Sequence, residues 1–180
     1  MGPSLGAINR SILLACDYFI TPMSSDVFSL LALGNIGSSI SSWSKLFNKG
    51  ILELDEDKKR SLDGMRQRCE IEFLGYVEQQ YIMKYTGGTA RAVRAYDEIL
   101  KQIPEAIQKD VVNQINIGKD NEINYKIGSI PNFYSLVPMS QTAHKPIFEL
   151  SACDGVVGAH YQKVKAFESL MNAIVDRMLN

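Results

Sequence analysis

Cysteine is scarce in this sequence, and the cysteines that are present form no recognisable pattern. Cys16, Cys69 and Cys153 are odd in number, lie far apart and include no C-x-x-C pair. Such spacing is typical of reduced thiols in a cytosolic protein and argues against a disulfide framework. The cysteines also fall among apolar residues, which predicts buried, inert thiols rather than a catalytic or metal site shared with His144 or His160.

Long apolar runs and an excess of charge are also absent. No segment approaches the ~18 consecutive apolar residues that can span a bilayer, and the N-terminus lacks the basic-then-apolar pattern of a signal peptide. The formal net charge is −1 over 180 residues, so overall charge gives no argument for nucleic acid or an acidic partner. We therefore expect a soluble, cytoplasmic protein with no membrane partner, forming a single domain over residues 1–180.

A phosphate-binding loop is missing as well. The pattern G-x-x-x-x-G-K-[ST] surrounds phosphates with backbone N–H groups and a lysine, and supplies a hydroxyl for magnesium. Gly118–Lys119 is followed by Asp120, and residues 86–89 contain two glycines but no lysine in register. Phosphoryl transfer depends on these groups for positioning and for charge stabilisation. We expect no ATP hydrolysis by this chain alone, no catalytic residue and no metal ligand.

Apolar periodicity predicts helices that alternate with strands. Helices are expected at 5–15, from a cap within 24–26 to about 47, from 90 to about 117 with a break at Pro104, and at 160–179. Strands are expected at 17–22, ended by Pro22, at 71–83, and as one or two short strands within 125–141. Residues 54–64 are expected to form a charged connection or short helix, and 84–89 a loop.

Apolar residues at helical spacing are expected to face the core. They are Leu5, Ile8, Ile12 and Ala15 in the first helix; Val27, Leu30, Leu31, Ile36, Ile40, Trp43 and Phe47 in the second; and Val164, Phe167, Met171, Ile174 and Met178 in the last, which is expected to dock over the sheet. Gly34 and Gly37 cost the second helix stability, so we expect them to allow close approach of a neighbour. Together these elements predict an α/β fold with a mostly parallel sheet and flanking helices.

The order of these blocks resembles the second half of the ParA/MinD-type partition ATPases. Three blocks carry the resemblance: GPSLGAINRSILLACDYFITPMSSDVFSLLAL (2–33), FLGYVEQQY (73–81) and SLVPMSQTAHKPIFEL (135–150). They are similar to the stretch after the family's Walker B aspartate, to its strand "vlGvvlN" near the adenine, and to the loop on the other side of the base. The resemblance covers nearly all 180 residues.

A partial P-loop-NTPase-like fold follows from this resemblance, without the N-terminal strands, the phosphate loop and the Walker B aspartate. The chain is therefore expected to be the C-terminal portion of such an ATPase. Three or four predicted strands are few for a doubly wound sheet, which agrees with this expectation. A sheet edge near residues 17–22 is then expected to be unpaired, which favours self-association.

The resemblance also implies a nucleotide site on particular residues. Gly2, Pro3 and Ser4 match the switch region that senses the γ-phosphate; a frayed N-terminus is the alternative. Gln79 matches the adenine-side position, where the family often has Asn; a solvent-facing amide or helix cap is the alternative. Pro138 and Met139 match the loop beside the base; a plain turn is the alternative. ATP and Mg are implied for the intact protein, and no cofactor is expected for this chain alone.

Non-specific DNA binding by basic residues of the C-terminal half is a further implication. Arg91 and Arg94 are three residues apart and are expected to share a helix face, and Lys163 and Lys165 open the last helix. Acidic residues lie among them, so a solvated mixed-charge face is the alternative.

Two functions therefore remain open. The resemblance implies a dimeric ATPase of plasmid or chromosome partitioning, whose hydrolysis is stimulated by a centromere-binding partner protein. The alternative is a non-catalytic α/β interaction module for dimerisation or DNA binding.

Overall fold

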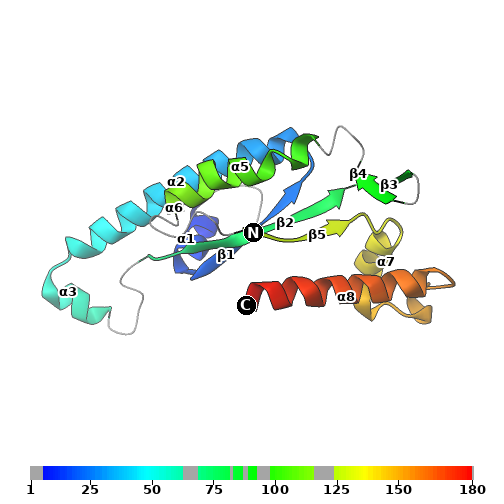
Figure 1. The fold of residues 1–180 in the computed structure, drawn as a ribbon. Coiled ribbons are helices and arrows are strands. Elements are labelled where there is room, and N and C mark those ends of the chain that lie inside the picture. Colours follow the sequence, from blue (N-terminus) through cyan, green and yellow to red (C-terminus); the bar gives the residue numbers. More distant parts are fainter. Residues whose placement is uncertain are drawn as a thin grey trace. The chain divides into compact units, whose positions relative to one another are not determined.

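The structure is a computed structural model that describes residues 6–62, 69–81, 83–86, 89–92, 98–115 and 124–179. It confirms an α/β fold in which a three-stranded parallel sheet, in the order β1-β2-β5, is flanked by helices (Figure 1). The chain divides into two compact units. The first takes the described residues of Met1–Thr21, Asp26–Gly75 and Ile99–Tyr125, and the second those of Pro22–Ser25, Tyr76–Glu98 and Lys126–Asn180.

The first predicted strand is present as β1 (Tyr18–Ser24), but it continues past Pro22 instead of ending there. Among the described strands β1 lies at the edge of the sheet, as predicted. An edge strand tolerates proline because one side of its backbone needs no partner strand. The side chains of Tyr18 and Ile20 are 59% and 40% exposed on this strand.

The helix before it, α1 (Ala7–Ala15), buries a different face from the one predicted. Leu13 is buried and Leu14 packs on the same cluster, whereas Ile8 and Ile12 are exposed. Several apolar residues follow one another in this helix, so its sequence fits more than one stripe. Contact with the neighbouring helix decides which stripe is buried.

That neighbour is the long helix α2 (Val27–Leu52). Asp26 caps its first turn, because the Asp26 Oδ1 atom accepts a hydrogen bond from the Ser29 N–H at 2.8 Å. The helix is fully buried at Leu33, Gly37 and Ile40, while the predicted core residues Val27 and Leu31 are exposed. The core of the first unit gathers buried side chains of α1, of α2 and of the residues just before β2: Leu13, Ile40, Cys69 and Ile71.

Alongside α2 lie α5 (Ile103–Ile107), the π-helical segment η1 (Gln108–Val112) and α6 (Asn113–Ile115) (Figure 1). Pro104 is in the first turn of α5, where its missing N–H leaves no bond unmade. A Cβ atom at Gly37 would overlap the carbonyl oxygen of Asp110 in η1, whereas nothing lies within 4 Å of one at Gly34. The predicted close approach is therefore confirmed at Gly37 and wrong at Gly34.

The sequence predicted the short helix after α2 correctly, but it did not predict the hairpin after β2. The predicted short helix is α3 (Glu56–Ser61), capped by Asp55, whose Oδ1 accepts from the Lys58 N–H at 2.8 Å. The predicted loop and the start of the predicted helix at 90 are instead two antiparallel strands, β3 (Met83–Thr86) and β4 (Thr89–Ala92). The Gly-Gly pair between two short runs was a hairpin signal that the prediction missed. Residues 93–97 lie outside the described residues.

In the second unit, β2 (Glu72–Tyr81) pairs in parallel with β5 (Lys126–Pro131), with Val77 opposite Gly128 and Gln79 opposite Ile130. The last helix, α8 (His160–Leu179), docks on this pair as predicted. Val77, Ile127 and Ile174 are buried together, and a Cβ at Gly128 would lie 2.7 Å from the Ile174 Cγ1 atom.

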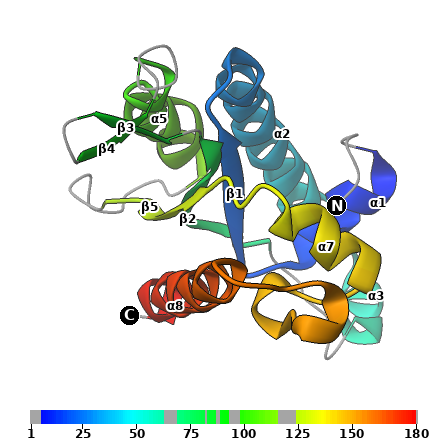
Figure 2. The ribbon, with the colours of Figure 1, turned by 90° about the vertical axis from the view of Figure 1, so that its right-hand side faces the viewer.

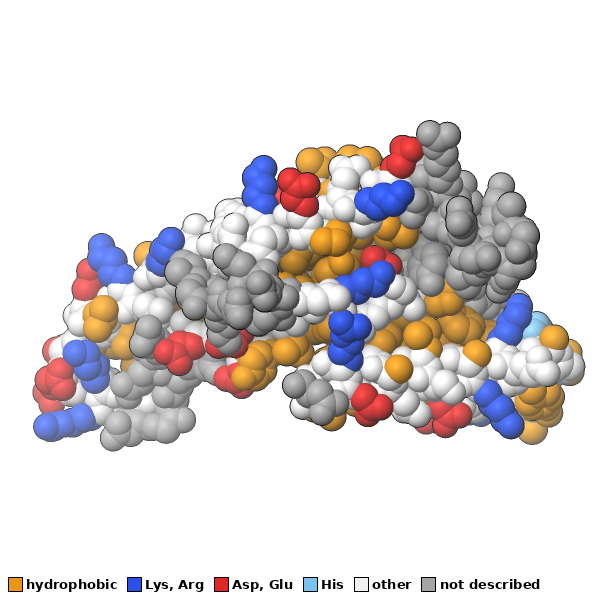
Figure 3. All heavy atoms as spheres, in the orientation of Figure 1, with side chains coloured by type: hydrophobic (Ala, Val, Ile, Leu, Met, Phe, Trp, Pro, Cys, Tyr) orange, Lys and Arg blue, Asp and Glu red, His pale blue; other side chains and the backbone are white. Residues whose placement is uncertain are grey.

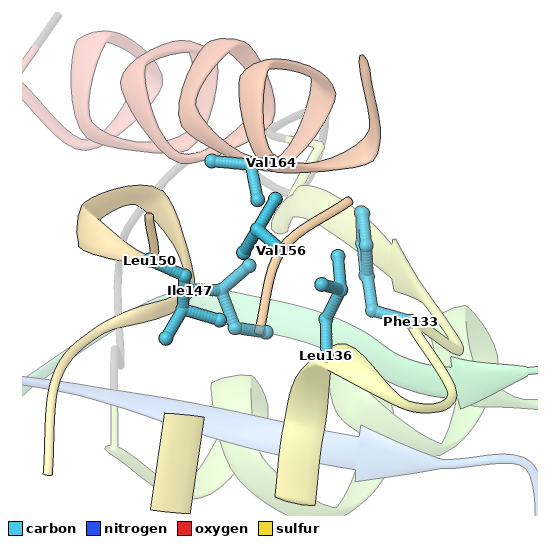
Figure 4. Close-up of a cluster of buried hydrophobic side chains, with 6 residues drawn as sticks. All are labelled: Phe133, Leu136, Ile147, Leu150, Val156 and Val164. Atoms are coloured by element: carbon cyan, nitrogen blue, oxygen red, sulfur yellow. The ribbon is translucent and has the colours of Figure 1, made fainter. Parts of the chain in front are cut away.

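A second cluster fills the space between α8 and the chain that follows β5. That chain forms α7 (Leu136–Ala143) and two 3-10 turns, η2 (Ile147–Glu149) and η3 (Ala152–Asp154), shown in yellow and orange in Figure 2. The buried side chains of this cluster, the last of them from α8, point toward one another in Figure 4: Phe133, Leu136, Ile147, Leu150, Val156 and Val164. The predicted strand or loop at 135–141 is therefore helical, and Pro138 occupies its first turn, which does not use the missing N–H.

Candidate functional site

The carboxyl ends of β2 and β5 lie next to each other in the second unit. Gln79 is opposite Ile130 and Tyr81 is opposite Pro131, where β5 ends. The chain reaches α7, which carries Pro138 and Met139, five residues after Pro131. In open α/β sheets, ligands bind outside the carboxyl ends of the strands. The segment after β5 is therefore the place to look for a site.

A cavity of about 530 Å³ lies there, lined mostly by one side of α7 and by η3. Its lining residues are Ser135, Pro138, Met139, Thr142, Ala143, Cys153 and Asp154. The volume is within the ~300–1,000 Å³ usual for small-molecule sites. The structure thus brings Pro138 and Met139 together at a cavity, although in a helix rather than in the predicted loop or turn. Gln79 is not among the residues that line it.

The polar wall of this cavity is held by a network around Asp154. The Lys145 Nζ atom donates to Asp154 Oδ1 at 2.9 Å and to Oδ2 at 3.0 Å. The Ser151 hydroxyl and N–H also donate to Oδ2, at 2.8 and 3.0 Å, which caps η3. The hydrogen bond from Lys145, followed by those from Ser151, lowers the pKa of Asp154 below its ordinary value. A carboxylate with a fixed orientation therefore borders the cavity at neutral pH.

Ser135 contacts a histidine at the other end of the cavity. Its Oγ atom lies 3.3 Å from Nε2 of His160, the first residue of α8, and Nδ1 of that ring is buried without a hydrogen-bond partner among the described residues. A serine nucleophile needs a base whose second nitrogen is oriented by another group. Since Nδ1 has no such partner, we assign this pair no catalytic role.

The three cysteines differ in their surroundings. All are free thiols, but Cys69 is buried whereas Cys153 is exposed beside the cavity, so the prediction of inert buried thiols is wrong for Cys153. The Cys69 Sγ atom is 3.2 Å from Ser44 Oγ, and its backbone N–H donates to Asn48 Oδ1 at 2.8 Å. Asn48 and Ser44 thus fix Cys69 inside the first unit.

We expect iodoacetamide to alkylate Cys153 at least tenfold faster than Cys69 in the native protein, because a thiol reacts only where the reagent reaches it. Peptide mass spectrometry after timed quenching measures both rates. Cys153→Ser is the control, and the slow rate at Cys69 should not change in it. Equal rates at the two cysteines in native buffer would contradict the described burial.

A buried polar cluster that the sequence analysis missed lies on β2 and β5. The carboxylate of Glu78 is nearly inaccessible and accepts from Lys126 Nζ at 2.7 Å and from Ser129 Oγ at 2.8 Å. Because Tyr76 and Glu78 are two residues apart on one strand, they point to the same face. Burial, and to a smaller extent the charge of Glu78, raise the pKa of Tyr76 to about 12. A charged residue directly after the apolar stretch 73–77 was the signal in the sequence.

The raised pKa of Tyr76 makes the folded state less stable at alkaline pH. Folding raises the pKa of Tyr76 from its ordinary value of 10.0 to about 12, so the unfolded chain loses this proton first. Stability is fully present below about pH 10 and should fall by on the order of 2 kcal/mol as pH rises to about 12. Urea unfolding between pH 9 and 12 measures it. Tyr76→Phe should remove this part of the pH dependence, and an unchanged slope in that variant would sink the assignment.

The predicted DNA-contacting residues that the structure describes lie on two different elements, β4 and α8. Arg91 lies in β4, opposite Lys84, and not on a helix, so a helix face shared with Arg94 is wrong; Arg94 lies outside the described residues. Lys163 and Lys165 are exposed in the first turns of α8. The Lys163 Nζ atom is 5.9 Å from the centroid of the Tyr134 ring. Basic and acidic side chains are interspersed along α8 in Figure 3.

Three remaining expectations concern the switch region, a metal site and a membrane-spanning helix. Gly2, Pro3 and Ser4 are outside the described residues. Within the described ranges, no three His, Cys, Asp or Glu side chains gather in a way that could hold a metal ion. Likewise, none of the described helices combines the length and apolar character needed to cross a membrane.

Comparison with known proteins gives similarity of fold. No protein-family model and no curated protein matches the chain. Among solved structures, the chain is similar to protein DIP2308 from Corynebacterium diphtheriae, with a TM-score of 0.51 and 22% sequence identity. The match covers 74% of this chain and 43% of that one, so this chain spans less than half of the matched protein. At this identity, the similarity shows that the two proteins share an α/β fold.

Proposed function

We propose that this chain is the C-terminal portion of a ParA-like partition ATPase and that the cavity at α7 receives the adenine base of ATP. One observation carries the proposal: Pro138 and Met139, which the resemblance assigns to the base, line the same cavity after the carboxyl end of β5. The cavity is built from the segment that follows β5, and ligands in open α/β folds bind outside the carboxyl ends of the strands.

The chemistry of the lining suits a flat heteroaromatic ring with polar edges. Pro138 and the flexible thioether of Met139 offer apolar contact to the faces of a ring. The Thr142 hydroxyl can donate or accept a hydrogen bond, and the fixed Asp154 carboxylate favours an amino group such as the one on adenine. Gln79 would act from the neighbouring strand end. The proposed role of this chain is therefore to hold the base, while the phosphates and Mg are held elsewhere in the intact protein.

Bound ATP supplies the intact protein with a switch between two states. In the proposal, the ATP-loaded form dimerises and binds DNA non-specifically, with Lys163 and Lys165 contributing phosphate contacts. A centromere-binding partner protein then stimulates hydrolysis. A small number of phosphate contacts makes DNA affinity weak, and salt lowers this affinity with a slope set by the number of contacts.

ATP hydrolysis tests the proposal most simply when this chain is assayed beside a version joined to its upstream coding sequence. We expect hydrolysis only in the longer protein, because the lysine and the metal site of a phosphate loop are required. In the longer protein, Met139→Glu should raise KM for ATP at least tenfold by placing a charge in the base cavity. Gln141→Glu, which adds the same charge to the exposed side of α7, should leave KM unchanged.

Other outcomes would count against the proposal. Activity of the short chain would mean that a different nucleotide site exists. Absence of activity in both proteins, with self-association intact, would favour a non-catalytic interaction module. The open edge at β1, where Tyr18 and Ile20 are exposed, is the observation that keeps this second candidate.

A further inference from the structure

The first unit contains a second cavity, which nothing in the nucleotide proposal uses. It is a groove of about 590 Å³ between α1 and the C-terminal half of α2. One wall is an apolar stripe at helical spacing: Trp43, Leu46, Phe47, Gly50, Ile51 and Leu54. Trp43 and Ile51 are eight residues apart, so the helical part of this wall is about 12 Å long. Leu46 is 66% exposed, whereas Trp43 and Phe47 are partly buried and also pack against the core cluster of the first unit.

Charge in the groove is confined to one residue of the opposite wall. Arg10 on α1 is the charged residue in the lining, and none of the described acidic side chains is part of it. No ion pair of Arg10 is recorded within the described parts of the chain. A mostly apolar site whose described lining carries one cation is complementary to a molecule with an apolar body and one negative group.

Gly50 leaves the floor of the groove open. Nothing lies within 4 Å of the position that a Cβ atom would take there, although Gly50 is inside a helix that alanine would stabilise. An occupant can therefore approach the α2 backbone between Leu46 and Leu54. Because a Cβ atom at Gly50 meets no other atom of the described structure, a larger side chain at this position is the variant chosen to block the groove.

We propose that this groove binds an amphiphilic carboxylate, a medium-chain fatty acid, with the alkyl chain along the α2 stripe and the carboxylate at Arg10. The carboxylate matches the planar guanidinium in a two-point hydrogen bond. The alkyl chain covers the exposed leucine and aromatic surface of α2. The groove shares no lining residue with the proposed base cavity, so the result of the ATP hydrolysis assay does not decide whether the groove binds a fatty acid.

Trp43 is the only tryptophan in the 180-residue sequence and lies in the wall, so its fluorescence reports directly on the groove. The experiment titrates the full chain with decanoate, dodecanoate and bromine-labelled dodecanoate, below the concentration at which they form micelles. We expect saturable quenching by the brominated acid. Affinity should rise about two- to fourfold for each added methylene, because each one removes apolar surface from water.

Matched variants separate the role of each wall. Arg10→Gln should weaken dodecanoate binding at least tenfold, and Arg10→Lys should restore much of it. Lys45→Gln, the same loss of charge on α2 but outside the groove lining, should have little effect. Gly50→Leu should abolish quenching while circular dichroism shows an unchanged helix content.

Three results would overturn the proposal. The first is an absence of saturable quenching by any carboxylate in the folded protein. The second is equal affinity for dodecyltrimethylammonium, which would mean that Arg10 does not select the head group. The third is a Trp43 emission that depends on protein concentration and that Gly50→Leu suppresses, because a second copy of the chain would then cover the groove.

Discussion

Replacing Gly37 by alanine is expected to lower the free energy of unfolding by about 2 kcal/mol, within the usual cost of overpacking a tight contact. The same replacement at Gly34 is expected to raise it by about 0.5–1 kcal/mol, because alanine is the better helix former. The two glycines are three residues apart in α2, so helix propensity alone predicts a gain at both positions. The predicted difference in sign comes from the neighbour of Gly37.

That neighbour is backbone rather than a side chain. A Cβ at Gly37 would overlap the Asp110 carbonyl oxygen and would lie 3.0 Å from its carbonyl carbon and 3.3 Å from the Val111 Cα. A flexible side chain could rotate away, but the π-helical segment η1 must shift as a whole, and its residues Val111 and Val112 are buried. Two segments distant in sequence therefore meet at this one glycine.

Urea denaturation followed by circular dichroism measures both variants against the parent protein. The midpoint should fall for Gly37→Ala and rise for Gly34→Ala, with the same slope. If both variants are stabilised, the contact between α2 and η1 is not present in solution as described.

The second large effect is expected at the ion pair between β2 and β5. Lys126→Met should lower the free energy of unfolding by about 2 kcal/mol, below the ~3–5 kcal/mol reported for fully buried pairs, because the lysine is partly solvated. The Glu78 side chain is 8% exposed and Lys126 is 38% exposed. In this variant the Glu78 carboxylate stays buried. Of its two hydrogen bonds from Lys126 and Ser129, only the one from the Ser129 hydroxyl is kept.

A double-mutant cycle separates the ion pair from the loss of packing. Glu78→Gln in the Lys126→Met background should recover part of the lost stability, because the buried charge is then removed. Lys165→Met on the exposed face of α8 is the matched control and should change stability by less than about 0.5 kcal/mol. If Lys126→Met costs no more than this control, the pair contributes nothing measurable.

The sequence predicted the element types best where a pattern was long or a cap was present. The last helix, α8, and the start of α2 at its Asp26 cap are confirmed, because a long stripe and a capping side chain are local signals. The face of α1 and the hairpin β3–β4 were not predicted correctly. In α1 the choice of face depends on α2, and in the hairpin the strands are too short for periodicity to distinguish them from a helix.

The residues that line the cavity at α7 were only partly singled out by the sequence. The resemblance selected Pro138 and Met139, and both line the cavity at α7. Cys153 and Asp154 complete that lining from a 3-10 turn about fifteen residues later, and no local pattern in the sequence connects them with α7. The Glu78 pair was missed because its partner Lys126 is 48 residues away, and their pairing depends on the register of two parallel strands.

Protection of Cys153 by nucleotide tests the central claim most directly, since this thiol lies beside the cavity proposed to hold the base. The measurement is the rate of iodoacetamide alkylation at Cys153 in the protein joined to its upstream coding sequence, with and without saturating ATP. If the base occupies the cavity at α7, the reaction is at least tenfold slower with ATP and is not slowed by inorganic triphosphate, which lacks the base. An unchanged rate at Cys153 while the same protein hydrolyses ATP would place the base elsewhere and contradict the account.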